Sequence, residues 1–247
     1  MHNALSLQEV RIEPRVADRN LAEIFVRQNG LVFEHGLLPP DLIEELYGEA
    51  CALEPQAQRK HLPFFKKGAS VSCFQMAGVA PRILGLYRSP LFRSLIESIT
   101  GETLEVCPDR DAHACALYYY TEPGDHIGFH YDTSHYRGSR FTVLIGLYDR
   151  SDARLVCRVG SDPNDASSEL HLATNPGMCV IFDGDKLYHR VSPIGAEQRR
   201  VVLSLEYVTD TGMSRWGRLV SRLKDSIAYF GFRQMFSRRR RRAGERV

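Results

Sequence analysis

The sequence predicts a mainly β protein with flanking helices. Between residues 105 and 210, short apolar and aromatic runs alternate with turn signals, a pattern typical of strands joined by tight connections. The first hundred residues contain instead candidate helices bounded by start and stop signals. At 247 residues and 43% hydrophobic content, the chain can bury a sizeable core.

Three helices are expected before the strand-rich half. The first covers about 17–28 and stops at a glycine, the second covers 41–53 behind two prolines, and the third covers 90–100 and ends at a glycine. A strand at 31–35 separates the first two. Segment 61–68 has no clean period, so we expect a loop there. Its aromatic and lysine side chains suit either a substrate lid or a packed surface loop.

The strand-rich half can be read in order. An aromatic strand at 116–120 is followed by a turn at 122–125. A second strand at 178–182 is closed by the turn 183–185, and a third at 200–207 shows period-two alternation.

Three side chains in this half are candidate metal ligands: His130, Asp132 and His189. On a strand, residues i and i+2 project to the same side, so His130 and Asp132 can reach one ion while Tyr131 points away. Two imidazoles and one carboxylate hold a divalent metal on one face and leave the opposite positions free, the ligand set typical of non-haem iron(II) oxygenases. The alternative is that both histidines are ordinary buried barrel residues.

A fixed cation is expected beside these ligands. Arg199 and Arg200 are neighbours, and a strand sends them to opposite faces. Arg199 shares its face with apolar positions 201, 203 and 205, which suit packing against helices. Arg200 shares a more polar face with 202, 204 and 206. We therefore predict that Arg200 anchors an acidic co-substrate, with Ser204 as a second donor.

The region from about 117 to 207 resembles the iron(II)/2-oxoglutarate-dependent dioxygenases, in their prolyl-4-hydroxylase-like branch. It has a Tyr-x-x-Pro-Gly approach to the His-x-Asp motif and a Pro-Gly-x-x-x-x-Phe run before the distal histidine. His189 and Arg200 belong to a series that also contains Val191, Pro193 and Gly195. The stretch 31–40 looks like the family's N-terminal strand and helix start. Residues 153–156 depart from a frequent Gly-Gly-x-Leu motif.

This resemblance implies a double-stranded β-helix (jelly-roll) core. It also implies that 2-oxoglutarate chelates Fe(II) while Arg200 holds its 5-carboxylate, that O2 takes the remaining position, and that succinate and CO2 are released as a C–H bond is hydroxylated. Related halogenases carry a small residue in place of Asp132, so the carboxylate favours hydroxylation. Tyr120 fits the place of a co-substrate tyrosine, with Tyr118 on the same strand face as the second choice. An ordinary strand aromatic is the alternative.

Three functions remain open from the sequence. The first is hydroxylation of a small molecule or a lipid-linked headgroup. The second is a hydroxylase or demethylase acting on a protein or nucleic acid, which loses ground because the Arg-x-x-x-x-x-Arg pattern of nucleic-acid demethylases is missing: Glu206 stands six residues after Arg200. The third is a non-catalytic jelly-roll binding module, and the intact ligand set argues against it.

The last residues differ from the rest of the chain. Apolar side chains at three- and four-residue spacing predict an amphipathic helix from 213 to about 236, and five arginines follow at 238–242. Segment 213–247 carries a net charge of +9 against +2 for the whole chain, which leaves −7 for 1–212. We expect one catalytic domain at 1–212 and a basic tail at 213–247.

Three roles for the tail stay open: peripheral contact with an anionic membrane, attraction to nucleic acid as the less favoured reading, or a solvated tail beside a helix that covers the domain. The six cysteines are widely spaced without a Cys-x-x-Cys pair, and the sequence begins without the features of a secretory signal. We therefore expect a cytoplasmic protein that could touch the inner face of a membrane through its tail.

Overall fold

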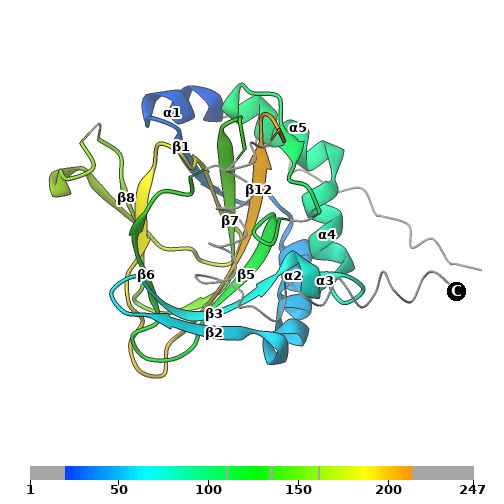
Figure 1. Cartoon of the computed structure of the whole chain (residues 1–247), viewed down its shortest axis with the longest axis vertical. Coiled ribbons are helices and arrows are strands. Elements are labelled where there is room, and N and C mark those ends of the chain that lie inside the picture. The colour runs from blue at the N-terminus through cyan, green and yellow to red at the C-terminus, as the bar shows by residue number, and fades with distance from the viewer. Residues whose placement is uncertain (1–19, 110, 134–135, 161, 213–247) are drawn as a thin grey trace, which may run out of the picture.

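The computed structural model describes residues 20–109, 111–133, 136–160 and 162–212. Within them the strands form a single antiparallel sheet that curls back on itself (Figure 1). Its strands are β1 (Leu31–His35), β2 (Gln58–Leu62), β3 (Lys66–Ser72), β4 (Glu105–Val106), β5 (Cys115–Tyr120), β6 (His126–His130), β7 (Arg140–Arg150), β8 (Leu155–Arg158), β9 (Glu169–Leu172), β10 (Met178–Asp183), β11 (Tyr188–Val191) and β12 (Arg199–Val208).

The strand order is that of a double-stranded β-helix. Neighbours along the sheet run β1-β10-β7-β12-β5-β3-β6-β11-β8-β9, while β2 pairs with β3 and β4 with β12. The eight strands β5 to β12 therefore divide into two groups, β5-β12-β7-β10 and β6-β11-β8-β9. Strand β3 joins the groups because Ala69–Ser72 pairs with β5 and Lys66–Lys67 pairs with β6. The jelly-roll core expected from the resemblance is confirmed.

The helices cover the outer face of the β7-β12-β5 side (Figure 1). They are α1 (Leu21–Arg27), α2 (Pro40–Leu53), α3 (Cys73–Met76), α4 (Pro81–Arg88) and α5 (Pro90–Thr100). Buried apolar side chains from the helices and from the outer face of the sheet form one core, which we call the helix-side cluster. Its members include Leu46, Phe92, Val143 and Leu203. This core leaves the opposite face of the sheet free to build a cavity.

Local signals place most helix ends as predicted. Helix α2 begins with a proline in its first turn, where the missing N–H costs nothing. In α5 the Ser89 side chain accepts a hydrogen bond from the Phe92 N–H, and Gly101 ends the helix at φ 75°. Helix α1 begins at Leu21, later than expected, because the Asn20 side chain caps it by accepting from the Glu23 N–H.

The loop predicted at 61–68 is wrong at both ends, and only residues 63–65 form a turn. Strands β2 and β3 form a hairpin there, paired from Gln58↔Ser70 to Leu62↔Lys66. Strand β2 is polar and only partly buried, so it lacks the apolar alternation that identifies strands in a sequence. Helix α4 was also not predicted.

The predicted C-terminal helix and basic tail cannot be compared with the described part of the chain. The helix and arginine run at 213–247 lie outside the described residues. Among the helices that are described, none has the length and apolar character needed to cross a membrane.

Candidate metal centre

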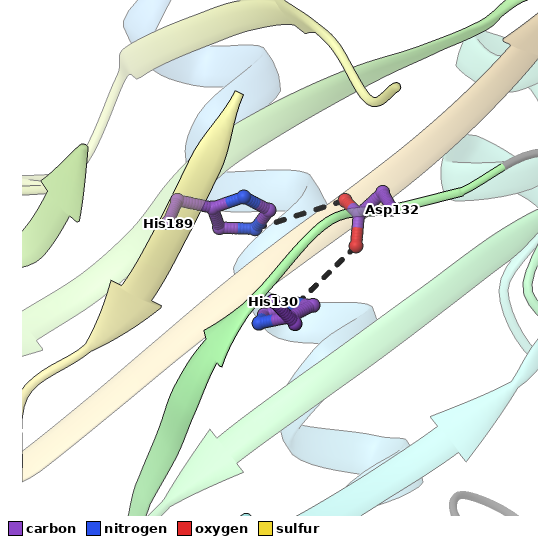
Figure 2. A group of neighbouring side chains, drawn as sticks. All are labelled: His130, Asp132 and His189. Carbon is purple, nitrogen blue, oxygen red and sulfur yellow. Dashed lines mark ion pairs between the residues drawn. The ribbon is translucent and has the colours of Figure 1, made fainter. Parts of the chain in front are cut away.

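Two neighbouring strands and the irregular segment that follows one of them bring the three predicted ligands together (Figure 2). His130 is the last residue of β6, and His189 lies directly opposite it on β11. The Nε2 atom of His130 is 3.3 Å from Oδ1 of Asp132, and the Nε2 atom of His189 is 3.8 Å from its Oδ2. One ligand atom from each residue lies within 4.8 Å of the others, a spacing that suits a single ion.

Asp132 is not on the strand, so one part of the sequence argument is wrong. Strand β6 ends at His130, and the chain is irregular from Tyr131 onward. Asp132 reaches the histidines because it packs against the turn after β10, where a Cβ on Gly184 would lie 2.8 Å from the Asp132 carbonyl oxygen. Only a residue without a side chain allows this approach.

Backbone carbonyls set the direction of both imidazoles. Nδ1 of His130 is 2.8 Å from the Gly128 oxygen, and Nδ1 of His189 is 3.0 Å from the Leu187 oxygen. Each Nδ1–H can therefore donate to a carbonyl, which leaves Nε2 with its lone pair facing the aspartate. This is the usual arrangement around metal-binding histidines.

The electrostatic environment favours the protonation states that a metal needs. Burial lowers the pKa of His189 to about 4, with a further decrease from His130, so its imidazole is neutral at pH 7. Burial alone would raise the pKa of Asp132. The neighbouring His189 and His130 outweigh that effect and hold the pKa well below its usual value. An ionised Asp132 carboxylate and a His189 imidazole that resists protonation both suit metal binding, because a ligand has to be deprotonated to bind.

The ligands line a cavity of about 280 Å³ inside the curled sheet. The other predicted site residues line the same cavity: Tyr118, Tyr120, Arg200 and Ser204. Strand β12 contributes its inner positions 200, 202, 204 and 206, as the period-two alternation predicted.

Arg200 is a buried cation whose donors are not all used. It is 1% exposed, and its Nε and Nη1 atoms have no hydrogen-bond partner in the described part of the chain. Tyr120 lies beside it, with the guanidinium carbon 5.4 Å from the ring centre. Burial lowers the pKa of Arg200 and raises that of Tyr120 to about 12. A buried guanidinium with spare donors is costly unless an anion binds it, and a carboxylate matches its fork geometry.

Arg199 shows the opposite behaviour. It points to the helix side and holds the Glu54 carboxylate with two bonds, of 3.0 and 2.7 Å. The predicted division of the two arginines between the faces of β12 therefore agrees with the structure. The donor set and the orphaned Arg200 together fit an iron ion with a dicarboxylate co-substrate.

Ser204 does not aim a free donor at the cavity. Its hydroxyl donates to Oε1 of Glu206 at 3.4 Å. Among the other histidines, His113 lines the cavity, while Nδ1 of His126 is 2.8 Å from the Gly124 oxygen at the start of β6. His135 lies outside the described residues.

Sequence reasoning missed a polar group next to the ligands. The hydroxyl of Thr142, on β7, lies 3.0 Å from Oδ2 of Asp132 and can donate a hydrogen bond to it. The same hydroxyl lies 3.0 Å from Oε2 of Glu206. Arg140 and Asp111 line the same end of the cavity and are ion-paired at 3.0 Å. The available signal was the polar inner face of β12, where Glu206 follows Ser204.

No family model matches the sequence, and no curated protein matches it. Solved structures do resemble the fold. The non-heme alpha-ketoglutarate-dependent epimerase SnoN from nogalamycin biosynthesis superposes with a TM-score of 0.63 at 16% identity, over 81% of this chain and 88% of that one. A Trichoplax adhaerens prolyl hydroxylase, in complex with a hypoxia inducible factor peptide fragment, gives 0.62 at 16% identity, over 84% and 93%.

A third similar structure is EctD from S. alaskensis with 2-oxoglutarate and 5-hydroxyectoine. It gives a TM-score of 0.60 at 16% identity, over 84% of this chain and 87% of that one. The chain thus has the fold of oxygenases that depend on 2-oxoglutarate. At this identity the similarity shows the fold, and function has to be argued from the site.

Proposed function

We propose that the protein is an iron(II)- and 2-oxoglutarate-dependent dioxygenase that hydroxylates an unactivated C–H bond of a small molecule or lipid-linked headgroup. One observation carries this proposal. The cavity that contains two histidines and an aspartate within 4.8 Å of one another also contains the buried Arg200, whose spare donors suit a carboxylate.

Each residue has a distinct part in this proposal. His130, Asp132 and His189 hold Fe(II), and their arrangement on one side leaves the other side open. Arg200 binds the 5-carboxylate of 2-oxoglutarate, with the Tyr120 hydroxyl and the Tyr118 ring completing that end of the cavity. Together with O2, the iron and 2-oxoglutarate supply the oxidising chemistry, and the protein orients the groups and limits access of water.

The test is succinate release by the purified full-length protein. Release should require both iron(II) and 2-oxoglutarate and should fall to background when His130 or His189 is replaced by alanine. Turnover that continues without 2-oxoglutarate would contradict the co-substrate assignment. A folded protein that binds neither iron nor 2-oxoglutarate would favour the non-catalytic binding module.

The size of the cavity supports a small substrate, because about 280 Å³ must also house the co-substrate. A protein substrate is the second candidate, and the β2–β3 hairpin favours it. Phe64 at the hairpin tip is 99% exposed, and the next residue, Phe65, lies edge-on to His130 with 6.2 Å between ring centres. Mass spectrometry of candidate metabolites and peptides after turnover would distinguish these classes by a gain of one oxygen atom.

Membrane contact and cytoplasmic location are also part of the proposal. The basic segment 213–247 would dock the enzyme at an anionic inner membrane surface, where each basic residue contributes ~1 kcal/mol. Co-sedimentation with anionic liposomes should retain the full chain and release a truncation after Gly231. Equal, negligible binding by both would remove the proposed membrane contact.

A further inference from the structure

We propose that Thr142 and Glu206 form a hydrogen-bonded support that holds the Asp132 carboxylate in position for the metal. This inference rests on the proposed metal site and assigns positioning roles to two residues outside the ligand set.

Asp132 needs such a support because the sheet does not hold it. His130 and His189 lie opposite each other on paired strands, whereas Asp132 lies beyond the end of β6. Each imidazole ring is held by a hydrogen bond between its Nδ1 and a backbone carbonyl. The Asp132 side chain projects from an irregular segment, so it has more rotamer freedom unless another group holds it. Thr142 sits on the central strand β7, and its Oγ1 is 3.0 Å from Oδ2 of Asp132. Thr142 therefore offers the Asp132 carboxylate a contact that is anchored in the sheet.

Glu206 decides which way the threonine hydroxyl points. Thr142 and Glu206 are direct partners in the β7–β12 register, and both are buried. Oγ1 of Thr142 is 3.0 Å from Oε2 of Glu206 as well as from Asp132. A hydroxyl has one hydrogen, so it can donate to one carboxyl and must accept from the other. Both contacts are satisfied together when Glu206 carries a proton and donates it to Thr142.

The surroundings of Glu206 are compatible with that arrangement. Burial, its largest influence, raises the pKa of Glu206 to about 8 despite the opposing charge of Arg140. Arg140 lies 3.7 Å from Oε2 and is itself held by Asp111, while the Ser204 hydroxyl is 3.4 Å from Oε1. Glu206 is thus fixed on two sides, and Thr142 is the group through which it acts on Asp132.

Metal affinity tests the threonine directly. Titration with Co²⁺, followed by the visible absorption of the bound ion, reports both affinity and coordination geometry without turnover. Thr142→Val should weaken binding by roughly 10–100-fold and alter the spectrum, because outer contacts to metal ligands typically have effects of this size. Thr142→Ser keeps the hydroxyl and should bind within a few-fold of the native protein.

A matched control separates positioning from general damage to the core. Thr174 is also fully buried, and its hydroxyl has no hydrogen-bond partner among the residues described. Thr174→Val should therefore leave Co²⁺ affinity and spectrum unchanged. Thermal unfolding of each metal-free variant identifies any that fail to fold.

Substitutions of Glu206 test the second half of the proposal. Glu206→Gln keeps a donor for Thr142 and should retain affinity, whereas Glu206→Leu cannot donate and should weaken binding about as much as Thr142→Val. The double variant Thr142→Val/Glu206→Leu should be no weaker than Thr142→Val alone, since both act through one hydroxyl.

The outcomes distinguish this inference from the proposed function. If native protein binds Co²⁺ and a folded Thr142→Val binds it equally well, the support is wrong while the metal site stands. Additive losses in the double variant, or equal losses for Glu206→Gln and Glu206→Leu, would also overturn the role of Glu206. If the native protein binds no Co²⁺ or Fe²⁺, both proposals fail.

Discussion

Side chains that alternate along β12 lie on two faces that differ in polarity and in how their groups are paired. Its outer side chains, Val201, Leu203 and Leu205, are fully buried in the helix-side cluster, and Arg199 has a bidentate partner. Its inner face carries Arg200, Ser204 and Glu206 around a cavity, and Arg200 has donors without partners among the described residues. The groups of the outer face are packed or paired within the protein, whereas the spare donors of Arg200 on the inner face need a bound ligand to pair with.

This difference teaches where to look for function in a β-helix. An apolar face gains free energy from burial alone, at about 25 cal/mol per Å². A buried polar face loses free energy unless its groups are paired, so unpaired buried cations point to a missing ligand. Mutations on the two faces should therefore separate activity from stability.

The largest expected effect is on the inner side. Asp132→Ala should reduce succinate release to background, because the proposed metal site loses the one carboxylate among its three ligands. The metal-free variant should still fold, because Asp132 lies on an irregular segment beyond the end of β6 and its side chain is 21% exposed. Measuring turnover and thermal unfolding of the same preparation checks both statements. A loss of activity explained entirely by unfolding would erase the contrast between the faces.

Leu203→Ala, on the outer face of β12, should lower the stability of the fold. Leu203 is fully buried between the sheet and the helices, so a cavity there should cost roughly 2–5 kcal/mol of unfolding free energy. The folded fraction should keep native turnover and native affinity for 2-oxoglutarate. Chemical denaturation measures the first quantity, and kinetics at low temperature measure the second. A change in 2-oxoglutarate affinity larger than the change caused by Arg200→Ala would contradict the separation.

The adjacent arginines provide a sharper comparison. Arg200→Ala should raise the 2-oxoglutarate concentration needed for half-maximal turnover by about 10–100-fold, the equivalent of ~1.5–3 kcal/mol for hydrogen bonds to a charged group. Arg199→Ala removes a half-exposed ion pair with Glu54 and should cost at most ~1 kcal/mol of stability, with the requirement unchanged. The reverse order would mean that the faces are assigned wrongly.

The last prediction concerns the dependence of stability on pH. His189 has a pKa lowered to about 4 by burial, against about 6.5 when the chain is unfolded. The unfolded state therefore binds more protons between these values, so stability of the metal-free protein should fall as pH falls from 6.5 towards 4, by at most ~1.4 kcal/mol per unit. His189→Gln should flatten this dependence. An unchanged slope in that variant would show that other groups are responsible.

Much of the inner face could be predicted because its signals are local. Period-two alternation assigned Arg199 and Arg200 to opposite faces. His130 and Asp132 do lie close together, but Asp132 reaches this position from beyond the end of β6 and not from the strand, where i, i+2 spacing would place it. Tyr120 came from the resemblance, and alternation along β5 added Tyr118 on the same face; both line the cavity. Turn and cap residues located the ends of α5 and the bend after β10, since these depend on the conformational preferences of a few neighbouring residues.

The hairpin at 58–72 could not be predicted because its strands are stabilised by neighbours rather than by their own pattern. Strand β2 is polar, and it is ordered by pairing with β3, which in turn bridges β5 and β6. A strand that is held by partners distant in sequence does not need alternating apolar residues of its own, so its sequence does not identify it.

The amino-acid sequence determined which side chains could serve as ligands, which face of β12 is polar, and where the chain turns, because these are properties of short segments. Tertiary structure alone decided that Asp132 reaches the histidines from beyond its strand, that Thr142 meets Glu206 across β7 and β12, and that the buried Arg200 keeps spare donors beside the cavity. Contacts of this kind depend on the register and curvature of a whole sheet, which are set by packing among residues far apart in the chain.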